Sequence, residues 1–258
     1  MITKFAAAKN AAAELNARRA ARARINSQKV VNWYRDPRNF APGAPIRLQY
    51  NNAKIKDTDT TAFIIFSLPA VITCPGANSL CMGACYARRD ERFPSVRKYR
   101  LANFAAARRA DFVARMAESI RAAIYTKKGN LRRRFIGKRI VFRLHESGDF
   151  FSRAYMLAWY EIAREFPFIQ FFTYTKSFDI YAACVDYKPD NFVVRASLWE
   201  GGTTARELEI VNALGMPVYT VLEDTTGADF VCNCGEGCGA CGCACAVAAL
   251  AEIIAAKH

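Results

Sequence analysis

The sequence has no apolar run of the length a membrane span needs, about 18 or more uninterrupted residues. Its longest such run, residues 63–73, is broken by Ser67 and Pro69. The first 28 residues are rich in alanine and arginine and contain no apolar segment typical of a secretory signal. We therefore expect an intracellular, cytoplasmic protein with no membrane partner. Cysteines in that compartment stay reduced, and clustered ones bind metal more often than they form disulfides.

Histidine and acidic residues are also scarce. The chain has His145 and the terminal His258, and 23 acids against 37 lysines and arginines give a net charge of +14. This surplus attracts polyanions, so nucleic acid or an anionic substrate is a candidate partner. No zinc-finger, RNA-recognition or helix-turn-helix signature accompanies it. No glycine-rich phosphate fingerprint follows a predicted strand, which weighs against a nucleotide-binding Rossmann domain.

Predicted strands and helices alternate along the chain. The strands are continuous apolar runs, as expected for strands buried on both faces, at residues 62–68, 139–144, 168–174, 192–196 and 217–222. Helical windows lie between them at 95–126, 151–166, 178–187 and 204–214, with Ser95 as an expected N-cap. The pattern predicts an α/β fold of right-handed βαβ units, either a partial or complete parallel (β/α) barrel of TIM-like type or an open doubly wound sheet.

Three parts are expected. Residues 1–60 form a basic N-terminal helix, at 3–30, and an irregular lead-in with a possible short strand at 46–50. Residues 61–231 form the barrel-like core. Residues 232–258 form a cysteine-rich metal-binding tail and a terminal helix.

Nine of the ten cysteines fall in two clusters, and Cys184 stands alone as an expected small buried residue. Cys74, Cys81 and Cys85 share one loop with the spacing C-x6-C-x3-C, which leaves one coordination position of a metal centre open. The second cluster holds six cysteines in fourteen residues: Cys232, Cys234, Cys238, Cys241, Cys243 and Cys245. So short a segment has little apolar core, so metal is expected to order it.

Iron–sulfur ligation, of the 4Fe–4S type, suits these thiolate spacings better than zinc, which more usually takes paired C-x2-C knuckles. Zinc remains the alternative. A fourth thiolate for the first cluster is expected from the tail, with Cys232, Cys238 and Cys241 ahead of the other three.

Polar residues follow the predicted strands, where parallel β/α folds gather functional groups. His145, Glu146 and Lys176 are the candidate catalytic residues. His145 is either a base, a metal ligand or an anion's hydrogen-bonding partner, or a buried histidine satisfied by its neighbours. Asp149 is expected to cap the helix that begins near Phe151.

The segment 88–139 is dense in positive charge and predicts a basic face that contacts nucleic acid. Its lysines and arginines include Arg88, Arg89, Arg92, Arg97, Lys98, Arg100, Arg108, Arg109, Arg115, Arg121, Lys127, Lys128, Arg132, Arg133 and Arg134.

Three blocks in order resemble the bacteriophage gene-product-eighty-eight family of phages and mobile elements. They are residues 68–75, the Cys81-x3-Cys85-Tyr86-Ala87 stretch and residues 143–150, followed by the cysteine-rich tail. The resemblance spans about residues 60–245 and implies a protein of a phage-infected or bacterial host cell.

More distantly, the layout is similar to that of radical S-adenosylmethionine enzymes. These place a three-cysteine loop after the first strand of a partial (β/α) barrel and a Gly-Gly-Glu segment after the second. Here Cys74, Cys81 and Cys85 take the first place and residues 146–149 the second, although the family's usual C-x3-C-x2-C spacing and its Gly-Gly-Glu are absent. The expected function is iron–sulfur binding in electron transfer or sensing. The alternatives are a zinc-stabilised nucleic-acid-binding module and a radical-type enzyme.

Overall fold

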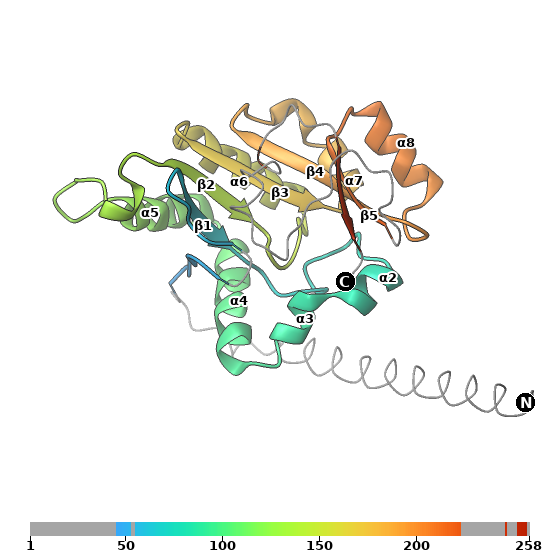
Figure 1. Ribbon diagram of the computed structural model, residues 1–258, viewed down its shortest axis with the longest axis horizontal. Helices are drawn as coiled ribbons and strands as arrows, with labels where there is room; N and C mark the ends of the chain where they lie inside the picture. The colour runs from blue at the N-terminus through green and yellow to red at the C-terminus, as the bar shows by residue number, and fades with distance from the viewer. Residues whose placement is uncertain (1–44, 53–54, 223–245, 247–251, 257–258) are drawn as a thin grey trace, which may run out of the picture. The chain divides into compact units, whose positions relative to one another are not determined.

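The computed structural model describes residues 45–52, 55–222, 246 and 252–256 (Figure 1). The chain divides into two units, residues 1–42 and 43–258, and all the described residues belong to the second. The predicted N-terminal helix and the six tail cysteines lie outside the described residues. Within the described part, no helix has the length and apolar character required to traverse a bilayer.

Six parallel strands form one sheet, and each strand pairs with the next one in the sequence. They are β1 (Thr61–Phe66), β2 (Arg139–Leu144), β3 (Ile169–Thr175), β4 (Phe192–Trp199), β5 (Val218–Leu222) and β6 (Glu252–Ala256). The predicted α/β class with a parallel sheet is confirmed. The order never reverses, so the sheet lacks the switch point of a doubly wound fold. No pairing joins β6 to β1 in the described residues.

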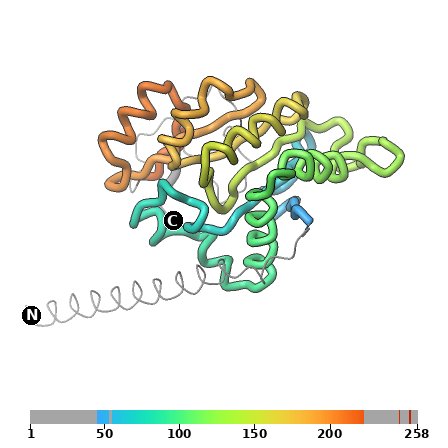
Figure 2. Tube along the Cα trace, turned by 180° about the vertical axis from the view of Figure 1, so that it is seen from behind, coloured from blue at the N-terminus to red at the C-terminus, as the bar shows by residue number. Residues whose placement is uncertain are grey.

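The strands are connected by the helices α2 (Ser79–Ala84), α3 (Tyr86–Asp90), α4 (Pro94–Ala107), α5 (Phe112–Ile124), α6 (Arg153–Glu165), α7 (Phe178–Ala182) and α8 (Ala205–Ala213). Helices α5 to α8 cover one face of the sheet, whereas α2 and α3 lie at the C-terminal ends of the strands (Figures 1 and 2). Short 3-10 turns follow at Arg133–Phe135 and Val185–Tyr187. The N-terminus of α8 carries a capping box between Thr204 and Glu207, in which each side chain accepts a hydrogen bond from the other residue's backbone amide.

The predicted helix over 95–126 is wrong as a single element. The chain bends between α4 and α5, where the Arg109 guanidinium forms a two-bond ion pair with Asp111. Ser95 is not the N-cap of α4, because the helix begins at Pro94 after Phe93. Proline suits the first helical position, where no amide hydrogen is needed.

Three further expectations need correction. Residues 252–256 form the strand β6 where the sequence predicts a terminal helix. The possible strand at 46–50 is reduced to one antiparallel bridge between Gln49 and Ile65. β4 continues to Trp199, three residues beyond its predicted end.

Alternate residues along each strand enter two different cores. Ile64, Phe142 and Phe171 face the helices, where the indole of Trp159 lies 5.2 to 5.7 Å from the rings of Phe66, Phe112 and Phe142. The opposite face has its own apolar cluster, formed by Ile55, Phe63, Ile65, Val141, Phe172, Val193, Ala246 and Ile253. Burial of both faces explains why the strands read as unbroken apolar runs.

Candidate functional site

A cavity of about 300 Å³ lies at the C-terminal ends of the strands, and residues of α2 and α3 form part of its wall. Every strand from β1 to β5 contributes to it directly or through the loop that follows it. The loop after β1 contributes the cysteines to the cavity wall. β2 and the loop after it contribute residues between Arg143 and Asp149, and β3 and its loop contribute Tyr174, Thr175 and Lys176. Ser197 and Trp199 line it from β4, and Tyr219 and Val221 from β5. This is the edge at which parallel β/α folds collect functional groups.

The structure brings Cys74, Cys81 and Cys85 to this cavity, and all three are half-buried free thiols. Cys81 lies within α2, and Cys85 is both the C-cap of α2 and the N-cap of α3. Burial raises the pKa of the Cys74 thiol, and the nearby Asp149, Cys85 and Cys81 raise it further. Burial also raises the pKa of Cys81, against the lowering effect of Lys176. The thiols of Cys74 and Cys81 are therefore protonated at pH 7, and any metal bound there would have to displace those protons.

Close backbone packing holds the cysteine loop against its neighbours. Gly76 lies against the backbone carbonyl of Lys176, leaving no room for a Cβ. Gly148 has a φ of +89°, and a Cβ there would lie 2.6 Å from both the Leu68 Cβ and the Thr73 Oγ1. Both glycines are thus required where the cysteine loop meets the loops after β2 and β3.

The Asn78 side chain joins the cysteine loop to the loop after β4. Its Oδ1 accepts a hydrogen bond from the Cys81 amide at 2.8 Å, and its Nδ2 donates to the Gly202 carbonyl at 2.7 Å. One side chain therefore caps α2 and ties it to a segment 124 residues away.

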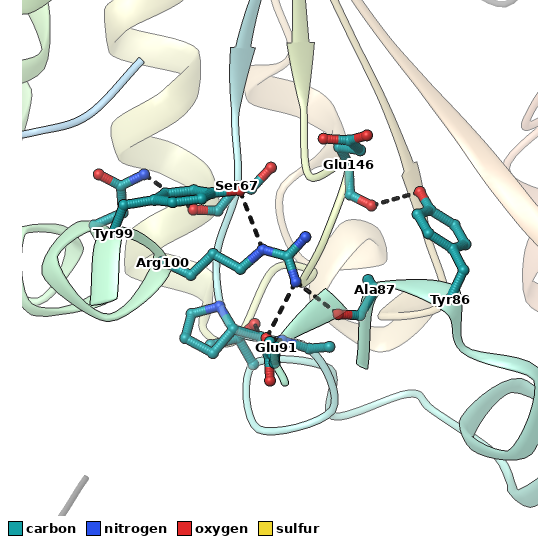
Figure 3. Close-up of polar contacts among 11 residues, drawn as sticks. Ser67, Tyr86, Ala87, Glu91, Tyr99, Arg100 and Glu146 are labelled. Atoms are coloured by element: carbon teal, nitrogen blue, oxygen red, sulfur yellow. Dashed lines mark hydrogen bonds and ion pairs between the residues drawn. The ribbon is translucent and has the colours of Figure 1, made fainter. Parts of the chain in front are cut away.

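A second set of contacts anchors α3 (Figure 3). The Tyr86 hydroxyl donates to the Glu146 carbonyl at 2.7 Å, and the buried Arg100 donates to the Ala87 carbonyl at 2.7 Å and pairs with Glu91 at 3.3 Å. Glu91 also accepts the Ala70 amide at 2.7 Å. Arg100 is thus a structural cation, which corrects its assignment to a solvent-facing basic surface.

His145 borders the cavity but is itself buried. Its Nε2 lies 3.0 Å from the Tyr155 hydroxyl and its Nδ1 lies 3.3 Å from the Thr173 hydroxyl. Burial lowers the pKa of His145 to about 3, with a further contribution from Arg143. Both ring nitrogens have partners and the ring is neutral at pH 7, so the geometry gives His145 a positioning role.

Asp149 does not cap α6, because Ser152 does so by accepting the Tyr155 amide. Instead the Asp149 carboxylate accepts the Phe150 amide, the Thr175 hydroxyl and the Lys176 amide, at 2.7 to 2.8 Å. Burial raises its pKa to about 6, against these hydrogen bonds. The carboxylate thus fixes the backbone that carries Lys176.

The Lys176 ammonium lines the cavity, where it donates to the Ser197 carbonyl at 2.5 Å and lies 5.6 Å from the centre of the Trp199 ring. Burial lowers its pKa to about 8. Glu146 also lines the cavity and accepts a hydrogen bond from the Asn52 side chain at 2.6 Å. Both candidates from the sequence therefore face the same space as the three cysteines.

Sequence reasoning missed the aromatic and cationic wall of the cavity. The Arg143 guanidinium lies 4.3 Å from the centre of the Tyr174 ring, and that ring lies 4.6 Å from the Tyr219 ring. Arg143 interrupts an apolar strand on the face opposite the helices, and this break in the run was an available signal. Trp199 gave no signal, because β4 was expected to end at Ala196.

In the described residues, no three His, Cys, Asp or Glu side chains are grouped so as to hold a metal ion. The tail cysteines, Cys232, Cys234, Cys238, Cys241, Cys243 and Cys245, lie outside that part of the chain, so their predicted ligation stays a prediction. Cys184 is fully buried in the helix-side core, as expected.

Comparison with known proteins agrees with the motif blocks of the sequence. The Gene 88 protein of Mycobacterium phage L5 is 29% identical over 188 residues, covering 66% of this chain and 76% of that protein. The Gene 88 protein of Mycobacterium phage D29 is 31% identical over 112 residues, covering 40% of this chain and 42% of that protein. No solved structure matches the chain. The sequence profile of the Gene product 88 family matches residues 45–229, which is well over half of the chain and includes the whole cysteine loop, so the protein belongs to this phage family.

Proposed function

We propose that the protein is an iron–sulfur enzyme whose cluster is held by Cys74, Cys81 and Cys85 and faces a small ligand in the cavity. One observation carries the proposal. The three cysteines, on the loop after β1, line the same cavity as Glu146, on the loop after β2, and Lys176, on the loop after β3. A purely structural metal site has no need of an adjoining ligand cavity.

The sequence spacing of the loop cysteines supports a cluster over a single zinc ion. Structural zinc more usually takes paired C-x2-C knuckles, whereas Cys74, Cys81 and Cys85 follow the spacing C-x6-C-x3-C. All three are half-buried thiols that line the cavity.

The finer fold assignment is part of the proposal. Consecutive parallel strands, with the cysteine loop directly after β1, support an open portion of a (β/α) barrel similar to that of radical S-adenosylmethionine enzymes. The wider cysteine spacing and the absence of Gly-Gly-Glu set this chain apart from that family. S-adenosylmethionine is accordingly one ligand to test.

The chain's own residues supply binding and orientation. Lys176 places a positive charge near Cys81 and offsets thiolate charge. Tyr174 and Trp199 give the cavity an aromatic wall that suits a planar ligand, and Arg143 and Lys176 favour an anionic group on it. The cluster, when bound, supplies electrons or Lewis acidity.

Anaerobic isolation of the full chain, followed by iron and sulfide analysis, tests the proposal. We expect stoichiometric iron and sulfide in the wild type and a large loss in Cys74→Ala, Cys81→Ala and Cys85→Ala. Cys184→Ala is the matched control, because Cys184 lies in the helix-side core and should leave iron content unchanged.

Three results would contradict the proposal in different ways. Zinc without sulfide would favour the zinc-stabilised module. Full iron that survives loss of all three loop cysteines would move the cluster to the tail and favour electron transfer or sensing. Absence of any metal would remove the site altogether. Reductive cleavage of S-adenosylmethionine by the wild type, lost in Cys81→Ala, would support the radical-type enzyme.

A further inference from the structure

The basic residues between 88 and 139 do not form one face. The lysines and arginines at 127–139 lie at the N-terminal ends of the strands, where Lys138 donates to the Thr58 carbonyl and Arg134 pairs with Asp57 just before β1. Those at 88–98 follow the cysteine loop at the C-terminal ends. The six residues of β1 span about 20 Å and separate the two groups. The structure therefore corrects the single basic face expected from the sequence.

The group at the C-terminal ends adjoins the cavity. Arg89 lines the cavity wall and is also exposed, and Arg92, Arg97 and Lys98 are exposed in the segment that follows it, up to the first turns of α4. We call these four residues the mouth patch. The neighbouring Glu91 is engaged by the buried Arg100 and the Ala70 amide. Residues 88–98 hold five basic side chains against Asp90 and Glu91, so this stretch has a net charge of +3.

An aromatic ring accompanies this charge. Phe93 is 48% exposed between α3 and α4, and the Arg92 guanidinium lies 4.7 Å from the centre of its ring. Exposed rings and guanidinium planes are the surfaces on which unpaired bases stack.

We propose that the mouth patch binds a single strand of nucleic acid and directs one unpaired nucleotide into the cavity. The inference rests on the proposed function, because it takes the cavity as the reactive site. Charge complementarity favours a phosphate backbone along Arg89, Arg92, Arg97 and Lys98. A base enters a cavity of about 300 Å³ only when it is unstacked, which favours a single strand over a duplex. Tyr174 and Trp199 line this space and make part of its wall aromatic.

Fluorescence anisotropy with a short labelled single-stranded DNA, titrated against the anaerobically isolated chain at several salt concentrations, tests the proposal. The mouth variant is the triple change Arg89→Glu, Arg92→Glu and Arg97→Glu. Its matched control is Lys127→Glu, Lys128→Glu and Arg133→Glu, which reverses the same number of exposed charges at the far end of the sheet. We expect the mouth variant to bind more than about tenfold more weakly, with a salt slope smaller by about 2. The far variant should stay within about threefold of the wild type.

Phe93→Ala separates stacking from charge. It should weaken binding by about fivefold or more and leave the salt slope unchanged. Equal losses in the mouth and far variants, or tighter binding of the matching duplex than of the single strand, would overturn the inference.

Iron analysis of the same preparations keeps the two proposals apart. Full iron and sulfide without patch-dependent binding overturns the docking surface and leaves the cluster. Patch-dependent binding without iron or sulfide overturns the cluster and leaves the docking surface.

Discussion

Gly76, between the first two cysteines, lies directly against the backbone carbonyl of Lys176 in the loop after β3. The cysteine loop and the cavity lysine are therefore positioned by the same contact. Any side chain at residue 76 must push these two loops apart.

Gly76→Ala should lower both iron content and stability, because the added methyl group overlaps a backbone that cannot rotate away. We expect a loss of about 1–3 kcal/mol in the free energy of unfolding, measured with urea. Gly83→Ala is the control in the same loop, since a Cβ there meets nothing within 4 Å. Alanine within α2 should hold stability constant or raise it by up to about 1 kcal/mol. Similar losses in both variants would show that the contact with Lys176 is unimportant.

Gly148→Ala should be more destabilising than Gly129→Ala. Both glycines have a positive φ, +89° and +80°, so both substitutions incur the cost of a left-handed backbone, about 1–2 kcal/mol. A methyl group at Gly148 also meets Leu68 and Thr73 at 2.6 Å, whereas Gly129 has open space around it. The extra loss at Gly148 is expected to be about 1–3 kcal/mol by urea unfolding. Equal losses of stability in the two variants would show that the positive φ alone accounts for the effect and that the contacts with Leu68 and Thr73 do not contribute.

The strands were predictable because their burial is local in the sequence. β2 matches its expected bounds residue for residue, and β1, β3 and β5 agree within two residues at each end. β1, β2 and β3 lie between two apolar layers, so a continuous apolar run marks each of them without any knowledge of its neighbours.

The bend after α4 was not predictable from propensity. Residues 106–110, where the bend falls, are alanines and arginines and so good helix formers, but Phe112 turns into the core beside Trp159, at 5.7 Å between ring centres. Tertiary packing sets that change of direction, and helix propensity does not report it. β6 illustrates the same limit, because a five-residue segment forms a strand through its pairing with β5.

The candidate site was partly predictable. Cysteine spacing and polar strand ends pointed to Cys74, Glu146 and Lys176, which all line the cavity. Asn78 and Tyr86 were missed, because their partners Gly202 and Glu146 lie 124 and 60 residues away. Only the folded chain shows that these side chains tie the loops together.

His145→Asn should alter the acid dependence of stability. The folded-state pKa of His145, about 3, lies below the unfolded value, so folding disfavours protonation and stability is lost as pH falls below about 6.5. Asparagine tolerates the positive φ of 56° at this position and does not titrate. The stability deficit of the variant relative to wild type should shrink by about 2 kcal/mol between pH 7 and pH 5.

Urea unfolding at the two pH values measures this effect. Asp149, whose raised pKa of about 6 acts in the opposite direction, is present in both proteins and cancels in the difference. Tyr155→Phe is the control, since it removes a partner of His145 and keeps the titrating ring. A wild type and His145→Asn whose stabilities change in parallel with pH would contradict the buried neutral histidine.

Lys176→Met should stabilise the protein at pH 7, because burial holds the pKa of this lysine at about 8, below its ordinary 10.5. The charged form is therefore a cost to folding below pH 8, and that cost disappears as the pH rises toward 10.5. After allowing for the lost hydrogen bond to the Ser197 carbonyl, we expect a gain of about 1–2 kcal/mol at pH 7 that falls toward zero or below by pH 10. Lys138→Met is the control, because Lys138 also donates to a carbonyl at 2.5 Å but is only half-buried, at the opposite end of the sheet. That variant should show no gain in urea unfolding at either pH. A loss of stability in Lys176→Met at pH 7 would mean that the cavity stabilises this charge in the free protein. A gain there would show that the chain keeps a buried cation beside Cys81 at the expense of stability, as expected of a residue retained for the ligand it binds.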